Sequence, residues 1–182
     1  MNPTPEYVAA AFDRLVQAEW DWRMAQFPRL ATQAGDHRFD DRLERMDAAS
    51  RAARLARWRD TRAALQRIDP ATLPPARRAD HAVYANQIET LLGEMEHGGV
   101  LMPMDGDQAF FSYLPDLWRE QPLHTAAQLQ AHLGRLAAIP QYFDDHIELL
   151  TEAVQRGLVL PAVVMQGRDA PLRQMLAAAD AT

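Results

Sequence analysis

Large apolar residues recur at helical spacing through most of this sequence. In one such arc, Tyr84, Ile88, Leu92 and Met95 fall on a single face, because a helix completes a turn every 3.6 residues. The alternating pattern of a half-buried strand is missing, and only the tail after Gly157 contains one short possible strand. We therefore expect an all-α fold of antiparallel helices, joined by short links rich in proline and glycine.

Capping and breaking residues mark where these helices begin and end. Side-chain oxygens cap helix starts, proline suits a first turn, and glycine suits the left-handed position after a helix end. The predicted boundary residues are Thr4, Pro5, Pro28, Gly35, Asp47 or Ser50, Gly98, Thr125, Pro140, Gly157 and Asp169. Two apolar stripes follow Thr125, first Leu129, Leu133 and Leu136, and then Phe143, Ile147, Leu150 and Val154.

Residues 100–118, "VLMPMDGDQAFFSYLPDLW", interrupt the helical periodicity. We expect one irregular aromatic loop segment here. Such segments pack over a core more often than they line a cleft, so packing is the first interpretation and a cleft the second. Within it, Asp105-Gly106-Asp107 resembles the start of a calcium loop, but the later acidic ligands are missing. A tight turn accounts for these three residues better.

Composition narrows the possible classes of protein. With 182 residues, of which 48% are hydrophobic, the chain can bury the core of a single helical domain, which we place over residues 1–182. A formal net charge of −6 argues against a dedicated nucleic-acid binder. The chain begins with no signal-peptide pattern and contains no apolar run of membrane-spanning length. We expect a cytoplasmic protein that contacts neither membrane nor nucleic acid.

Cysteine and lysine are both absent from the sequence. Without cysteine the chain has no disulfides, thiolate zinc sites or cysteine nucleophiles, and without lysine it has no Schiff-base or P-loop lysine. The helical pattern after Asp169 is not followed by a capping glycine or a polar tail. We therefore expect the chain to be the amino-terminal portion of a longer protein, although a frayed terminal helix would look the same.

Histidine patterns predict no metal site. A di-iron bundle needs two Glu-x-x-His pairs, and only Glu94-Met95-Glu96-His97 fits, at a helix end beside two glycines. The H-E-x-x-H pattern of a zinc peptidase is missing. His81 shares an arc with Tyr84, and we expect it to be a core histidine bonded to backbone.

Two opposite charges project from apolar helix faces. Glu19 lies among the apolar residues of the first helix, and Arg62 among those of the helix that ends near Ile68. Because a buried charge is costly unless it is paired, we predict that Glu19 and Arg62 form a buried ion pair, or that each finds another charged partner. The functional alternative is that Arg62 binds a substrate carboxylate.

Residues 33–43, "QAGDHRFDDRL", bring three aspartates, a histidine and two arginines into one short stretch. Our first interpretation is a structural turn, in which Gly35 ends a helix, Asp36 caps the next turn of backbone, and Arg38 and Arg42 pair with nearby carboxylates. A metal or acid–base site is the competing interpretation for the same residues.

A third interpretation follows from the family resemblance given below and places this stretch beside the substrate cleft of a complete family member. The cleft candidates are Asp36, His37, Arg38 and Asp105. A weaker possibility is an enzyme that uses carboxylates such as Asp105 and Asp107, but no base or positioned electrophile pairs with them. We assign no catalytic residue and no metal ligand.

The stretch "WDWRMAQFPRLATQAGDHRFDDRL" resembles the amino-terminal signature of the large bacterial family catalogued as DUF885. Further matches follow in the family's order: "RADHAVYANQIE", "LMPMDGDQAFFSYLPDL" and "RLAAIPQYFDDHIELLTEAVQRGLVLPAVVMQG". Each motif alone is weak, and the ordered set carries the resemblance over almost the whole chain. The resemblance implies a mostly helical protein grouped with gluzincin-like zinc peptidases.

In that family the histidine–glutamate metal motif lies further downstream, in sequence that these 182 residues do not contain. The resemblance therefore implies zinc and a peptide substrate for the full-length family, but no cofactor held by this chain. We predict an amino-terminal helical segment of a zinc metallopeptidase-like protein, inactive alone. The alternative is a non-catalytic helical binding module. Both hypotheses predict an exposed apolar patch, and neither fixes the oligomeric state.

Overall fold

The computed structural model describes residues 4–105 and 108–179, whose regular structure is almost entirely helical. The α-helices are α1 (Pro5–Gln26), α2 (Pro28–Gln33), α3 (Ala48–Gln66), α4 (Pro75–Glu96), α5 (Leu117–Glu120), α6 (Ala126–Ala137), α7 (Ile139–Gln155), α8 (Ala162–Met165) and α9 (Ala170–Ala179). The 3-10 helices are η1 (His37–Phe39), η2 (Pro70–Thr72), η3 (Gly99–Leu101) and η4 (Leu114–Asp116). The prediction of an all-α fold is confirmed.

The predicted strand after Gly157 is wrong. That stretch leads into the short helix α8, and its residues Leu158 and Leu160 pack against buried clusters beside α7. The one strand pair within the described residues lies in the aromatic segment, where β1 (Met104–Asp105) runs antiparallel to β2 (Gln108–Ala109). A strand needs a partner for its backbone groups, and only the hairpin supplies one.

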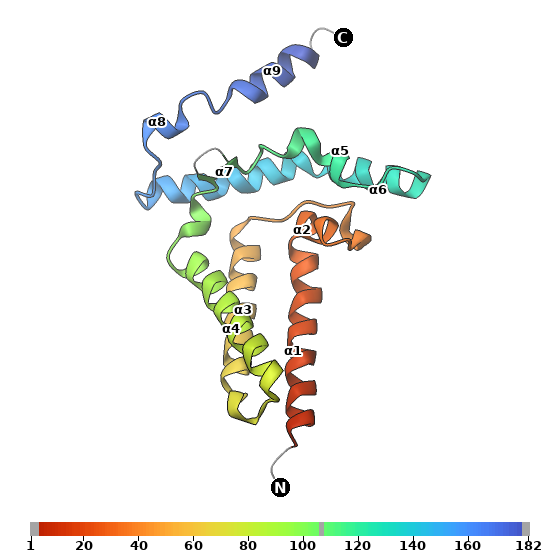
Figure 1. Ribbon diagram of the computed structural model, residues 1–182. Helices are drawn as coiled ribbons and strands as arrows, with labels where there is room; N and C mark the ends of the chain where they lie inside the picture. Colours follow the sequence, from red (N-terminus) through yellow and green to blue (C-terminus); the bar gives the residue numbers. More distant parts are fainter. Residues whose placement is uncertain (1–3, 106–107, 180–182) are drawn as a thin grey trace.

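The helices form two parts that cross. Helices α1, α3 and α4 lie side by side, and we call them the bundle (Figure 1). Helices α5, α6 and α7 run across one end of the bundle, where α2 also lies, and we call them the cross layer (Figure 1). Helices α8 and α9 lead away from the far side of α7 (Figure 1).

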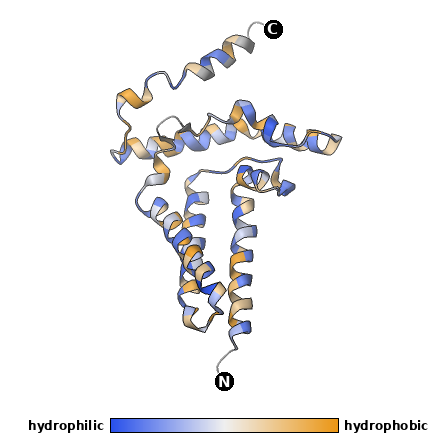
Figure 2. Ribbon diagram, viewed as in Figure 1, coloured by the Kyte–Doolittle hydropathy of each residue, from blue (hydrophilic) through white to orange (hydrophobic). Residues whose placement is uncertain are grey.

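Each part has its own apolar core. The bundle core contains Phe12, Trp58, Leu65, Leu73, Ile88 and Leu92. The second core joins the aromatic segment to α7 and contains Leu43, Met104, Ala109, Phe111, Leu114, Leu117 and Tyr142. The aromatic segment therefore packs as core, as its first interpretation expects. Figure 2 shows that α8, beyond this core, is hydrophobic along its length.

Several helix boundaries follow the predicted chemistry. The Thr4 hydroxyl accepts from the backbone N–H of Tyr7, and the Asp47 carboxylate accepts from that of Ser50. Thr125 forms a capping box at the start of α6. Gly35 has a φ of 82°, the left-handed conformation that ends α2. Within the described parts of the chain, every helix is too short or too polar to cross a lipid bilayer.

Helix α6 buries its polar side and exposes its apolar side, which is the opposite of what its amphipathic pattern predicts. Its leucines Leu129, Leu133 and Leu136 are 50%, 49% and 39% exposed, whereas His132 and Arg135 are buried. The next helix behaves similarly, because Ile147 is exposed while polar residues of α7 point inward. The outer side of α6 is therefore apolar and its inner side carries charge, whereas α7 also exposes Asp144 and Glu148.

The packing of the bundle core predicts that alanine substitutions at two positions on α4 differ strongly in their effect on stability. Ile88 is fully buried and Val83 is 72% exposed. We expect Ile88→Ala to lower the free energy of unfolding by about 2–5 kcal/mol, because it removes buried methyl groups and leaves a cavity. Val83→Ala, the matched control on the same helix, changes it by less than about 0.5 kcal/mol. Urea denaturation followed by circular dichroism measures both, and equal losses would contradict this packing.

Candidate functional site

Asp36, His37 and Arg38 lie in a turn that local contacts hold. Asp36 accepts from the backbone N–H of Arg38 at 3.2 Å and from its Nη2 at 2.7 Å. The hydrogen bond from the Arg38 guanidinium is the main reason why the pKa of Asp36 is lowered. Arg38 also reaches Asp21, and Nδ1 of His37 lies 2.9 Å from Oδ2 of Asp40. These contacts match the turn interpretation and engage all three side chains locally.

The other cleft candidate cannot be placed beside them. Asp105 ends β1, but its side chain lies outside the described residues, as does the whole of Asp107. Arg42 pairs with its neighbour Asp41 at 3.2 Å. The structure therefore brings Asp36, His37 and Arg38 together and does not add a fourth candidate to them.

Asp40, in the same polar stretch, has a longer-range partner that the sequence analysis missed. Its Oδ1 accepts from Nη2 of Arg135 at 3.2 Å, and the hydroxyl of Thr32 also donates to Oδ1. Arg135 donates further to Oγ1 of Thr32 at 2.8 Å and to the carbonyl oxygen of Phe39 at 3.2 Å. This buried cluster ties the last turn of α6 to the turn after α2.

Burial and ion pairing shift the pKa of Arg135 in opposite directions. Its side chain is 0% exposed, and burial lowers its pKa although Asp40 opposes that shift. All its contacts use Nη2, and among the described residues Nε and Nη1 are sealed without a hydrogen-bond partner. One signal could have identified it, since Arg135 is the only arginine, aspartate or glutamate in α6.

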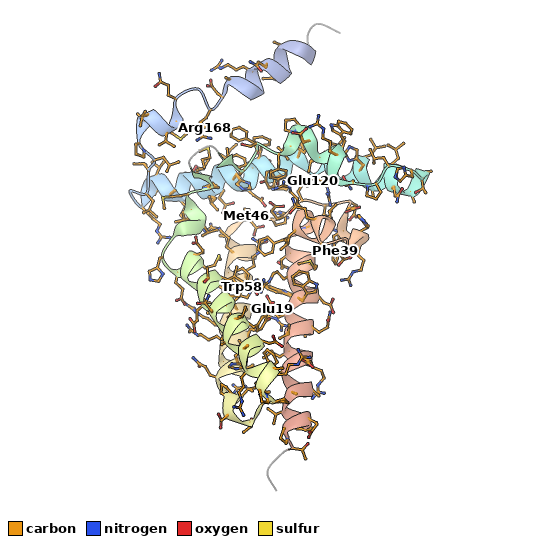
Figure 3. All side chains as sticks on the ribbon, in the orientation of Figure 1. Glu19, Phe39, Met46, Trp58, Glu120 and Arg168 are labelled. Carbon is orange, nitrogen blue, oxygen red and sulfur yellow. The ribbon has the colours of Figure 1, made fainter. Side chains whose placement is uncertain are left out.

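Glu19 is fully buried within the bundle, beside Trp58 (Figure 3). Its charged partner is Arg23 and not Arg62. Nε and Nη2 of Arg23 donate to its two oxygens at 2.9 and 2.8 Å. Nε1 of Trp58 donates to Oε1 at 3.0 Å, and the Tyr84 hydroxyl donates to Oε2 at 2.8 Å. Burial and then this hydrogen bond raise the pKa of Tyr84. Glu19 thus joins α1, α3 and α4 by four hydrogen bonds.

Glu19 and Arg62 do not pair with each other, because Arg62 lies near the surface, but each has another charged partner, which is the second form of the prediction. Its side chain is 34% exposed, and its nearest carboxylate is Glu89 on α4, at 3.5 Å. Arg23 lies one helical turn after Glu19, so it reaches the same buried position without crossing between helices. Glu19 therefore does not have the geometry of a substrate-binding group. Arg62 borders a pocket of about 250 Å³ together with Glu89, and its binding of a substrate carboxylate stays a prediction.

A second polar cluster lies between the bundle and the cross layer. Arg29 donates to Oε1 of Glu120 at 2.7 Å and to Oε2 at 2.9 Å, and its guanidinium carbon lies 3.9 Å from the centre of the Tyr113 ring. The Tyr113 hydroxyl lies 3.2 Å from Oε1 of Glu44 and 3.0 Å from the Tyr142 hydroxyl. Burial raises the pKa of Tyr113 far above its usual range, so this hydroxyl stays protonated.

The histidines are dispersed. No three His, Asp or Glu side chains of the described residues are arranged to hold a metal ion. His81 is buried, with Nε2 3.4 Å from the carbonyl oxygen of Leu65, as the core interpretation expects. His146 stacks on Phe110 with ring centres 4.1 Å apart, and burial lowers its pKa. His97 bonds back to the last turn of α4.

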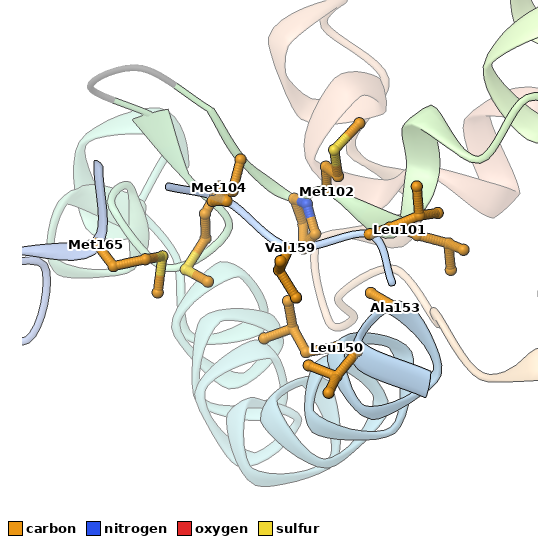
Figure 4. A pocket seen from close by; sticks show the side chains of 11 residues that line it. Leu101, Met102, Met104, Leu150, Ala153, Val159 and Met165 are labelled. Carbon is orange, nitrogen blue, oxygen red and sulfur yellow. The ribbon is translucent and has the colours of Figure 1, made fainter. Parts of the chain in front are cut away.

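An apolar groove lies between α7 and the segment that leads to α8. Its volume is about 270 Å³. Figure 4 shows Met104, Leu150, Val159 and Met165 around it. The full lining is Leu101, Met102, Pro103, Met104, Leu150, Ala153, Val154, Leu158, Val159, Leu160 and Met165. Because no charged side chain lines this groove, it suits an apolar partner and no acid–base chemistry.

Residues 28–182 match the model of a family described as "Bacterial protein of unknown function (DUF885)". The chain belongs to this family. Searches of curated proteins and of solved structures found no significant match. The DUF885 match begins at α2 and covers the Asp40 turn, the cross layer and the apolar groove. Helix α1, which supplies Glu19, precedes it.

The Arg135–Asp40 contact predicts a strong effect on stability. We expect Arg135→Met to lower the free energy of unfolding by about 3–5 kcal/mol, because it leaves the Asp40 carboxylate buried without its cation. Arg119→Met is the matched control, since Arg119 pairs with Asp116 in solvent and such pairs contribute little. Thermal and urea unfolding measure both variants. A control as destabilised as Arg135→Met would rule out a special role for the buried pair.

The Arg29–Glu120 contact predicts an acid-sensitive stability. The hydrogen bond from Arg29 is the main cause of the lowered pKa of Glu120 in the folded chain. A lowered folded-state pKa stabilises the fold above the unfolded value of about 4.3, and this contribution is lost as pH falls further. We expect Glu120→Gln to flatten the fall in melting temperature between about pH 5 and pH 3. Glu148→Gln serves as control, because Glu148 is exposed on α7. If the melting temperature of Glu120→Gln fell with pH as steeply as that of the unmodified chain, Glu120 would not be the source of the acid sensitivity.

Proposed function

We propose that this DUF885 chain is the amino-terminal helical segment of a zinc metallopeptidase-like protein. In this proposal it supplies a scaffold and a docking face, and the zinc ligands come from another part of the protein. The observation that carries the proposal is the orientation of α6, whose charged side is buried against α2 and the turn after it while Leu129, Leu133 and Leu136 face outward. An exposed apolar stripe of this kind is what a partner layer of polypeptide can cover.

The zinc assignment comes from the family resemblance. The described residues do not fit a zinc site, because no three potential ligands converge. Asp40, Glu19 and Glu120 are instead neutralised by arginines, and the Tyr113 hydroxyl is buried. These groups hold helices together, so their contribution to a peptidase would be to position the parts that carry the chemistry.

The second candidate is a non-catalytic binding module that acts through the same apolar side. The groove of about 270 Å³ beside α7 favours it, because a preformed apolar groove is typical of binding sites for helices and other apolar ligands. The two candidates differ in the partner. A scaffold docks on the remainder of its own protein, whereas a binding module recognises a separate molecule.

Metal content and peptidase activity test the leading proposal. We expect the purified 182-residue chain to retain less than stoichiometric zinc after dialysis and to leave a mixed library of fluorogenic peptides uncleaved. An established zinc peptidase, treated in parallel, controls for loss of metal and for assay sensitivity. One zinc per chain together with turnover that a chelator abolishes would overturn the proposal.

A further inference from the structure

A second pocket opens among the helices of the cross layer, and its walls are mainly apolar, with Phe111, Trp118 and Phe143 as their aromatic part. It has a volume of about 360 Å³ and lies between α5 and the junction of α6 with α7. The lining residues are Phe111, Leu114, Pro115, Leu117, Trp118, His132, Leu136, Ile139 and Phe143. His132 is the one ionisable residue in this lining, and it is buried, since its exposed fraction is 8%.

A chain of hydrogen bonds determines which His132 nitrogen carries the proton. Nε2 of Gln121 lies 2.8 Å from the carbonyl oxygen of Asp40, and only the amide NH₂ group can donate to a carbonyl. Oε1 of Gln121 therefore faces Nδ1 of His132, at 2.7 Å, and must accept from it. Neutral His132 consequently has its proton on Nδ1, which leaves the lone pair of Nε2 as a hydrogen-bond acceptor.

This acceptor has no bonding partner in the described parts of the chain. Nε2 of His132 makes no hydrogen bond there, and it is not among the polar atoms sealed from solvent without a partner. Because His132 lines the pocket and Nδ1 is engaged by Gln121, Nε2 is the ring nitrogen that is left to bind a ligand there. The pocket thus suits an aromatic group that carries one donor.

The surroundings of the pocket indicate where such a group comes from. Leu136 lines the pocket, and Leu133 and Leu129 continue from it along the exposed side of α6. That side carries no charge, because Arg135 is the only arginine of α6 and is buried. An aromatic anchor beside an uncharged apolar stripe is typical of polypeptide docking.

We infer that the pocket binds a tyrosine or tryptophan side chain of a polypeptide segment that packs along α6, with the phenol O–H or indole N–H donating to Nε2 of His132. The aromatic walls supply apolar and edge-to-face contact, and the histidine selects for the donor. The inference rests on the proposed docking role of the cross layer for the source of the side chain. It does not depend on zinc.

Three soluble probes test, on the unmodified chain, whether the pocket prefers an aromatic group with a hydrogen-bond donor. We expect N-acetyltyrosinamide to shift the methyl signals of Leu136 and Ile139 in NMR titrations with a millimolar dissociation constant. N-acetyl-O-methyltyrosinamide, which lacks the donor, binds about threefold to tenfold more weakly, the range of one hydrogen bond. Equal binding of the two amides, or no shift at these methyl groups, overturns the inference. Tighter binding of free p-cresol than of both amides overturns the polypeptide source.

Two variants test the role of His132. His132→Phe keeps an aromatic ring but removes the acceptor, so we expect it to bind both amides equally. His124→Phe is the matched control, because His124 is exposed before α6, and it retains the preference of about threefold to tenfold. Preserved discrimination in His132→Phe overturns the inference. Circular dichroism checks that both variants are folded. If His132→Phe unfolds, the comparison of the probes on the unmodified chain is by itself the test of the inference. Stoichiometric zinc together with peptide cleavage by the chain would overturn the proposed function but not this inference.

Discussion

The buried contact between Arg135 and Asp40 is the interaction on which the rest of the structure depends. It joins the cross layer to the turn after α2, and it sets the rotation of α6 about its own axis. Residues of a helix are separated by about 100°, so an inward Arg135 requires the leucines at positions 129, 133 and 136 to point outward. His132, which lies between these two directions, reaches both the interior and the aromatic pocket.

This arrangement explains why polar side chains fill the junction of the two parts. Burying Arg135, Arg29 or Asp40 is costly, and each is compensated by opposite charge or by hydrogen bonds. An apolar junction could slide with little penalty, whereas directional contacts allow one relative position. We infer that the charged junction contributes specificity of orientation more than stability, since the apolar cores of the two parts are separate.

Local features of the fold could be predicted from the sequence, because they depend on neighbouring residues. The Thr125 capping box, the Asp47 cap and the break at Pro28 belong to this class. Helical spacing also located the apolar stripe of α6, but it could not say which side of the helix faces the protein. The same limitation explains the wrong partner for Glu19, since two faces can both be apolar without meeting.

The polar stretch "GDHRFDDRL" contributes differently from what its composition suggests. Its exposed charges form a turn, and its one deeply buried carboxylate, that of Asp40, anchors Arg135. The backbone carbonyl of Asp40 also orients Gln121, which in turn fixes the proton on Nδ1 of His132. A single residue of the turn therefore determines both the rotation of α6 and the hydrogen-bonding character of the pocket beside it. A chain that lacks this carboxylate would lose the docking geometry even if every apolar residue of the outer surface were retained.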